Sequence, residues 1–179
     1  MGKAIGYLRK HEFAKLLIIA ILLISASLAT WNGLKIALNA ENPILVVVSG
    51  SMVPTLNVGD LIIIRGVPSD ELSVGTIIVF HSPADYDTLI VHRIVEKMRH
   101  DEDYAFKTKG DFNYYEDNWI VPSKYVVGAY IGKIPYIGFL VMKLKEPAGM
   151  SVIIVIIFIL IIMEFFEERK KKAVSSKSI

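Results

Sequence analysis

Two long uncharged runs constrain this chain more than any other feature of its sequence. The first, residues 16–34, contains nineteen residues without a charged side chain. A helix rises about 1.5 Å per residue, so a helix of this length spans the hydrocarbon core of a bilayer. We therefore predict a cytoplasmic flank over residues 1–15 and a transmembrane helix over residues 16–35. A removable signal peptide is the alternative, because Ser27 and Ala29 are small and stand two residues apart, as at a cleavage site.

The second run, residues 147–163, is dense in isoleucine and is followed by basic residues at 169–172. We predict a second transmembrane helix over residues 147–166 and a basic cytoplasmic tail over residues 167–179. A buried core helix is the alternative. The run has no polar face to turn to water, which favours the membrane.

The charges around the two runs predict how the chain lies in the membrane. Basic residues cluster at both ends of the chain, so the positive-inside rule places both termini in the cytoplasm. Residues 36–146 are then expected on the other side, and they are enough for one compact domain with its own core. We predict a multi-pass protein of the cell membrane with an extracytoplasmic domain; the endoplasmic reticulum membrane is the alternative.

The region between the two runs has the pattern of an all-β domain. Its apolar segments are short, β-branched and separated by Gly, Pro, Asp and Asn, and they cover residues 44–48, 61–64, 76–80, 89–95 and 125–131. We predict exposed hairpin loops at residues 84–88 and 99–103. The apolar stretch 134–144 is predicted to rest on the membrane surface or to belong to the core.

Composition excludes several classes of site and partner. The chain has no cysteine, so a disulfide framework, a thiolate zinc site and a cysteine nucleophile are excluded. The net charge is only +2 and the basic residues gather at the ends, so nothing indicates a nucleic-acid partner.

Ser51 stands where a predicted strand passes into a turn, in the segment VVVSGSMVPTL. Gly50 permits close backbone approach and Pro54 fixes the exit from the turn. The hydroxyl can therefore be presented rigidly, with backbone N–H groups nearby as oxyanion donors. Ser-Gly-Ser is also common in ordinary turns, so a purely structural role is the alternative.

A serine nucleophile needs a base, and the candidates are histidine, lysine and a terminal amine. Lys97, Lys107 and Lys109 lie close to the same segments, but we predict that the base is a histidine. Of the four histidines, His11 lies in the predicted cytoplasmic flank and His100 in a loop of charged residues, whereas His81 and His92 adjoin predicted strands. In LIVHRIVEK, the alternation of a strand places His92 on the same face as two isoleucines. The alternative is a semi-buried histidine that only makes hydrogen bonds.

Carboxylates follow in the segment KGDFNYYED, where Asp111 and Asp117 are six residues apart. A carboxylate can hold the tautomer of an imidazole and stabilise its cation. The alternative is an Asx-rich turn. A calcium-binding helix-loop-helix site is not predicted, because its ligand spacing and glycine position are absent.

Taken in chain order, the segments SGSMVPTL, GDLIII, GTIIVF, VHRIV and KGDFNYYED resemble the characteristic boxes of type I signal peptidases. The resemblance covers residues 46–117. It implies that Ser51 is the acylating nucleophile and that the Ser49 hydroxyl lies beside the Ser51 N–H in an oxyanion hole. Bacterial members usually have a lysine base where this chain has His92, so the histidine indicates the archaeal and endoplasmic-reticulum branch. In that branch the resemblance implies that Asp117 orients His92 and that Asp111 has a supporting role.

The resemblance also implies a fold, a substrate class and partners. The expected fold is a mostly antiparallel β domain with an apolar substrate groove. The expected substrates are exported preproteins, cut after small residues, and the expected partners are these preproteins, the lipid bilayer and the secretion translocon. No metal or organic cofactor is implied. The second predicted span favours an archaeal-like enzyme that works alone over a subunit of a complex.

Two rival functions remain on sequence grounds. One is a non-catalytic, membrane-tethered β module that has kept the fold. The other is a regulatory protease of the same fold that cleaves itself or one partner.

Overall fold

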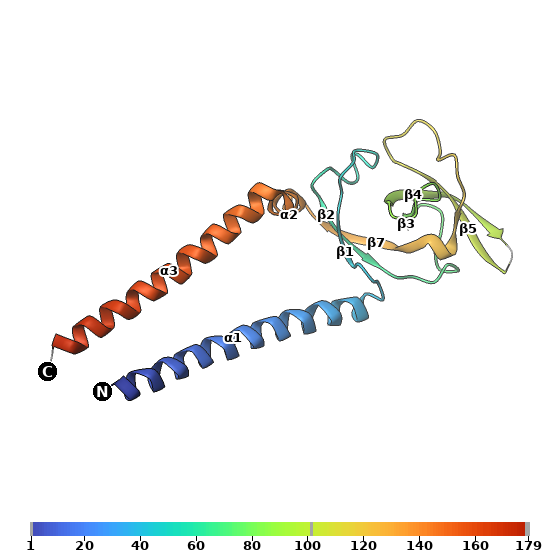
Figure 1. The fold of residues 1–179 in the computed structure, drawn as a ribbon. Helices are drawn as coiled ribbons and strands as arrows, with labels where there is room; N and C mark the ends of the chain where they lie inside the picture. Colours follow the sequence, from blue (N-terminus) through green and yellow to red (C-terminus); the bar gives the residue numbers. More distant parts are fainter. Residues whose placement is uncertain (1, 101, 178–179) are drawn as a thin grey trace.

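The computed structural model describes the backbone of residues 2–100 and 102–177, and side chains for most of them. Figure 1 shows a coiled β-sheet with two long helices that run away from it in the same direction. In chain order the elements are α1 (Gly2–Ala37), β1 (Ile44–Val46), β2 (Leu61–Arg65), β3 (Ile77–His81), β4 (Leu89–His100), β5 (Asp103–Lys109), β6 (Val121–Pro122), the 3₁₀ helix η1 (Ser123–Tyr125), β7 (Val126–Ile134), α2 (Ile137–Lys145) and α3 (Pro147–Lys177).

The described strands form one sheet in the order β1-β2-β7-β3-β4-β5-β6, and every neighbouring pair is antiparallel. The prediction of a mostly antiparallel β domain is therefore confirmed. The apolar runs located five of the strands to within a few residues, but they missed β5 and β6. The β5 segment, DYAFKTK, contains three charged residues, and β6 has only two residues, so neither has the apolar run from which strands are predicted.

The strand β4 is longer than its apolar run, because it continues to His100 and pairs there with β5. The loops predicted at residues 84–88 and 99–103 both join antiparallel neighbours, β3 to β4 and β4 to β5. The second is much tighter than expected, since Arg99 and His100 belong to β4 and Asp103 begins β5. The predicted alternation also holds, since His92 and Ile94 are buried whereas Arg93, between them, is partly exposed.

The core lies on both faces of the central strand β3. Ile77 and Val79 pack into one buried cluster, with Met52 and Leu56, whereas Ile78 and Phe80 pack into a second cluster, with Ile94 and Phe106. Successive side chains of a strand point to opposite faces, so a strand covered on both faces is apolar throughout. Burial of each such side chain stabilises the fold by about 1.5–3 kcal/mol relative to its exposure.

One described helix is by itself long and apolar enough to cross a membrane. It is the 20-residue segment Ile18–Ala37 of α1, and none of it is buried. The second predicted span is not a helix of this kind by itself. Its segment Pro147–Met163 is long and apolar enough to cross a membrane only when α2 is counted with it, and the two helices meet at a bend of 82°. A straight second span over residues 147–166 therefore stays a prediction.

The apolar stretch at residues 134–144 is mostly exposed. Gly138 is its buried residue, but large side chains such as Phe139 and Leu140 are 44% and 58% exposed. The core interpretation of this stretch is therefore wrong for most of its residues. The close approach of α2 to the domain depends on Gly138, since a Cβ there would lie 2.6 Å from the carbonyl oxygen of Gly59.

Candidate active site

Ser51 lies in the turn between β1 and β2, residues 49–60, which we call the Ser51 turn. The turn is anchored by Met52 and Leu56, whose side chains are completely buried in the core. Its backbone is closed by hydrogen bonds from Val53 N–H to Gly50 O and from Leu56 N–H to Met52 O, at 3.1 and 2.9 Å. The apolar residues that flank Ser51 therefore fix the place of its hydroxyl.

The Ser51 hydroxyl is one end of a row of three side chains that come from different parts of the chain. His92 on β4 has its Nε2 atom 3.1 Å from Ser51 Oγ, and its Nδ1 atom 2.6 Å from Asp117 Oδ2. With Nδ1 as donor to the carboxylate, Nε2 is free to accept the hydroxyl proton. This row can deprotonate a serine and stabilise the imidazolium that results.

Asp117 is held in place by strand β5. Thr108, which is completely buried, donates its hydroxyl to Asp117 Oδ2 at 2.6 Å, and its carbonyl accepts the Asp117 N–H at 2.9 Å. The side chains of His92 and Asp117 are only 8% and 7% exposed. Charges at such a place are poorly screened by water, so a carboxylate here interacts strongly with any charge on the imidazole.

Ser49 lies close to Ser51, two residues before it. The two hydroxyl oxygens are 3.3 Å apart, and either one can be the donor. Ser49 is exposed, and it lines the same cleft as Ser51. A second hydroxyl at this place can donate a hydrogen bond to an oxygen that develops negative charge beside Ser51 Oγ.

Asp111 does not contact His92 through a hydrogen bond; its carboxylate faces Arg93. Arg93 donates from Nε to Oδ1 at 2.8 Å and from Nη2 to Oδ2 at 2.6 Å, and Thr55 donates to Oδ2 at 2.5 Å. Hydrogen bonds from Arg93 hold the pKa of Asp111 below its ordinary value, against an opposing effect of burial. The two aspartates therefore have separate partners, although both belong to the segment KGDFNYYED.

The other histidines lie outside this row. His81, the last residue of β3, stacks on Tyr86 and contacts its carbonyl oxygen through Nδ1 at 2.6 Å. His100 is the last residue of β4. The side chain of His11 lies outside the described residues. Of the histidines whose side chains are described, His92 is the one beside Ser51.

A cleft of about 620 Å³ runs past the row of side chains. Its walls come from the end of β1 and the segment after it, and from the first half of β4, with Ser51, His92 and Asp117 between them. In β4, pairing with β5 begins only at Arg93, so the backbone before it lies open toward the cleft. The wall residues are Leu45, Val46, Val47, Val48, Ser49, Ile62, Val79, Thr88, Leu89, Ile90, Val91, Asn113 and Trp119.

The described residues hold no group of three or more His, Asp or Glu side chains close enough to bind a metal ion. The polar atoms around Ser51 instead bond to one another. This donor set offers acid–base chemistry at a hydroxyl.

Several residues around the site were not found from the sequence. Arg93 adjoins His92 in the box VHRIV, and Thr55 belongs to the box SGSMVPTL. Their membership of these boxes could have indicated that they lie near the site. Thr108 lies in the missed strand β5 and had none, because its role depends on the tertiary pairing of β5 with β4.

Known proteins resemble this chain over most of its length. The sequence profile of the family described as "Signal peptidase, peptidase S26" matches residues 11–96. The signal peptidase complex catalytic subunit SEC11C of Homo sapiens is 35% identical over 134 residues, which are 70% of this chain and 69% of the relative. The corresponding SEC11 subunits of Chaetomium globosum and Pyricularia oryzae are 33% and 34% identical, over 74% and 73% of this chain and 81% and 80% of their own lengths. With relatives this similar over two thirds or more of both chains, the protein belongs to the signal peptidase family, peptidase S26.

Proposed function

We propose that this protein is a membrane-anchored serine endopeptidase that removes signal peptides from exported preproteins, with Ser51, His92 and Asp117 as its catalytic residues. The observation that carries the proposal is the row of contacts from Ser51 Oγ through the imidazole to the Asp117 carboxylate. Its position in a cleft of about 620 Å³, the size of a small-ligand or short-peptide site, is the second support.

In the proposed reaction Ser51 Oγ attacks the carbonyl carbon of the scissile bond, and His92 Nε2 accepts the hydroxyl proton. The protonated imidazole then gives this proton to the leaving amine, which leaves an ester between Ser51 and the signal peptide. Water attacks the ester with His92 again as base, which releases the carboxylate and restores the serine. Asp117 stays ionised and stabilises the imidazolium in both halves of the reaction.

The oxyanion hole is assigned to the Ser51 N–H and the Ser49 hydroxyl. The short separation of the two serine hydroxyls supports this assignment, because an oxygen formed on the attacked carbon lies next to Ser51 Oγ. Asp111 is assigned a supporting role, consistent with its bonds to Arg93 and Thr55 on the far side of the turn.

The substrate is proposed to bind as an extended strand between the two walls of the cleft. The segment after β1 and the first residues of β4 offer backbone groups to such a strand. Val47, Val79 and Ile90 are among the side chains that restrict the space beside the peptide. Small residues before the scissile bond are then selected because larger ones do not fit.

The proposed topology has residues 16–35 and 147–166 in the membrane, residues 36–146 outside the cytoplasm, and residues 1–15 and 167–179 inside it. The common direction of α1 and α3 in Figure 1 supports it. The bend before Pro147 leaves the exposed apolar side chains of α2 free to lie on the membrane surface.

The membrane is proposed to be the cell membrane, with the endoplasmic reticulum membrane as the alternative. The curated relatives are described as catalytic subunits of a signal peptidase complex, which supports partner subunits for this chain as well. Association with the secretion translocon is part of the proposal, because preproteins reach the outer side of the membrane there.

The test is cleavage of a synthetic preprotein by the full chain purified in detergent, compared with Ser51→Ala and His92→Ala. We expect cleavage after a small residue at the signal-peptide boundary by the wild-type chain and none above background by either variant. Equal products from the wild type and Ser51→Ala would favour a non-catalytic β module. Cleavage of itself or of one partner, with no action on several unrelated preproteins, would favour a regulatory protease.

A further inference from the structure

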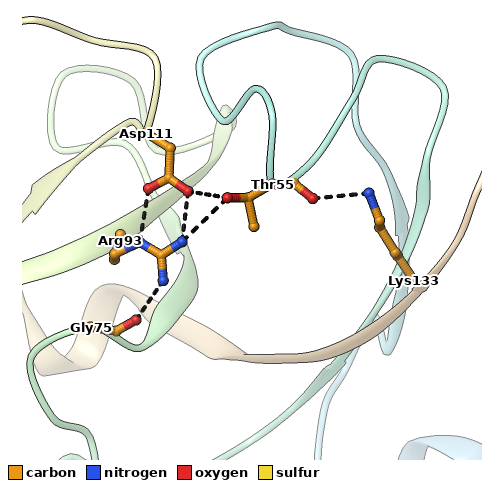
Figure 2. Close-up of polar contacts among 5 residues, drawn as sticks. All are labelled: Thr55, Gly75, Arg93, Asp111 and Lys133. Carbon is orange, nitrogen blue, oxygen red and sulfur yellow. Dashed lines mark hydrogen bonds and ion pairs between the residues drawn. The ribbon is translucent and has the colours of Figure 1, made fainter.

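Thr55, four residues after the nucleophile, forms hydrogen bonds with one member of each of two ion pairs. Its hydroxyl donates to Asp111 Oδ2 at 2.5 Å, and its carbonyl oxygen accepts from Lys133 Nζ at 2.9 Å. Figure 2 shows these contacts on opposite sides of the same residue. Neither ion pair includes Ser51 or His92.

The first ion pair joins β4 to the loop that follows β5. Arg93 binds the Asp111 carboxylate through two nitrogens and also donates from Nη1 to the Gly75 carbonyl at 2.8 Å. A guanidinium that binds a carboxylate through two parallel hydrogen bonds fixes direction as well as distance. The Asp111 carboxylate is therefore a fixed acceptor for the Thr55 hydroxyl.

The second ion pair joins β7 to the end of the Ser51 turn. Lys133 Nζ lies 2.7 Å from Asp60 Oδ2, and the same oxygen accepts the Asn57 N–H at 3.0 Å. Asp60 is only 1% exposed, so this contact is well shielded from water. One ammonium thus binds both Thr55 O and Asp60, which are five residues apart in the turn.

The loop with Asp111 also contacts the nucleophile itself. Phe112 N–H donates to Ser51 O at 2.9 Å, and Gly110 approaches so closely that a Cβ there would lie 2.6 Å from that oxygen. Asp111 lies between these two residues in sequence. Together with the bond from Thr55 to Asp111, these contacts fix the loop to the Ser51 turn at two points, Ser51 itself and Thr55.

We propose that Thr55 is a positioning residue for catalysis: it connects the Arg93–Asp111 and Lys133–Asp60 pairs and so holds Ser51 Oγ at hydrogen-bonding distance from His92. The inference rests on the proposed function of Ser51. A misplacement of the nucleophile by about 1 Å can lower the rate about a hundredfold. Thr55 is not among the residues that line the cleft, so its loss removes no contact to the substrate. Loss of the Thr55 hydroxyl should therefore change kcat and leave KM as it is.

The experiment compares Thr55→Val, which loses the hydroxyl at nearly constant volume, with Thr55→Ser, which keeps it. In preprotein cleavage by the full chain, we expect Thr55→Val to lower kcat about tenfold with KM unchanged, the size of one hydrogen bond to a charged group. Thr55→Ser should stay within about twofold of the wild type. Ser69→Ala is the matched control, because it removes a hydroxyl that donates to a different carboxylate, Asp103, and it should leave kcat unchanged.

A second readout does not depend on activity. The amide protons of Val53 and Leu56 are hydrogen-bonded inside the turn, and their exchange with solvent reports how firmly it is held. We expect Thr55→Val to speed this exchange about tenfold and Thr55→Ser to leave it unchanged. Unchanged exchange in Thr55→Val overturns the proposal even if the chain is no peptidase. Absence of Ser51-dependent cleavage in the wild type would instead contradict the proposed function.

A double variant tests whether Thr55 acts through the Arg93–Asp111 pair. Arg93→Lys keeps the charge but loses the paired hydrogen bonds, so it should also lower kcat with KM unchanged. Combined with Thr55→Val it should be little worse than Arg93→Lys alone. Losses that multiply, or a Thr55→Ser loss equal to that of Thr55→Val, overturn the proposal. If Thr55→Val does not fold, the Arg93→Lys variant tests the proposal by itself. A wild-type kcat in Arg93→Lys would overturn the proposal.

Discussion

Replacement of Asp117 by asparagine should lower kcat about a thousandfold. In the proposed reaction, proton transfer from Ser51 turns the His92 imidazole into a cation beside this carboxylate, and the side chains of the pair are only 8% and 7% exposed. Unit charges about 4 Å apart attract each other by about 4 kcal/mol at an effective dielectric constant of about 20. Tenfold in rate corresponds to about 1.4 kcal/mol, so loss of the charge costs about three powers of ten.

The substitution should have little effect on folding. Asparagine has nearly the shape of aspartate, and its oxygen can still accept from Thr108 and from His92 Nδ1. We expect kcat to fall, KM to remain within about threefold and the thermal midpoint to move by only a few degrees. Cleavage of a preprotein by the full chain in detergent measures the first two, and the unfolding of the same preparation measures the third.

Asp111→Asn is the matched control, because Asp111 belongs to the same segment but bonds to Arg93 and Thr55. Its loss in kcat should be about tenfold. A combination of Asp117→Asn with His92→Ala should be little worse than His92→Ala, since the two residues act as a unit. A loss below tenfold for Asp117→Asn, or losses of equal size for the two aspartates, would refute the assignment of Asp117 as partner of His92.

Three further predictions test the site and its supports. Activity should fall toward acidic pH, because a protonated histidine base accepts no proton, and a flat profile from about pH 5 to 8 would contradict a histidine base. The lowered pKa of Asp111 affects stability instead of activity. The ion pair with Arg93 stabilises the fold above the ordinary pKa of 3.8, and this stabilisation is lost as the pH falls through the lower pKa of the folded state. Below about pH 4 the thermal midpoint should therefore drop more in the wild type than in Asp111→Asn. Gly110→Ala should lower kcat more than tenfold because its Cβ meets the Ser51 carbonyl oxygen, whereas Gly132→Ala, with nothing within 4 Å, should not; similar activities would mean that the loop is free to move.

Stability provides one more prediction. Lys133→Met leaves the buried Asp60 carboxylate without its ion-pair partner, which should lower the free energy of unfolding by about 3 kcal/mol. Lys143→Met breaks an exposed pair with Glu146, where both side chains are more than half exposed, and should cost less than about 1 kcal/mol. Equal shifts in a denaturant titration would show that burial of Asp60 does not matter.

Much of the architecture was predictable because it depends on local patterns. An uncharged run long enough to cross a bilayer predicts the apolar segment of α1, and β-branched runs between turn residues predict most strands of the sheet. The boxes around Ser51, His92 and Asp117 predicted three residues that the structure brings together in the candidate site. Each box is one continuous segment of the sequence, so it can be recognised without knowledge of the fold.

The arrangement within the site depended on contacts between distant segments. The resemblance favoured Asp117 over Asp111 as the partner of His92, but the residues themselves do not separate the two aspartates. The pairing of β5 with β4 places Thr108 and Asp117 beside His92 and leaves Asp111 to Arg93. Whether α2 is buried or exposed could not be predicted either, because its apolar residues fit a core and a membrane surface equally well. The sequence by itself determined the membrane-type helix, the β class and the candidate residues of the site. The tertiary structure decided which carboxylate faces the imidazole, because register and strand pairing set the neighbours of a side chain and neither is recorded in its own segment.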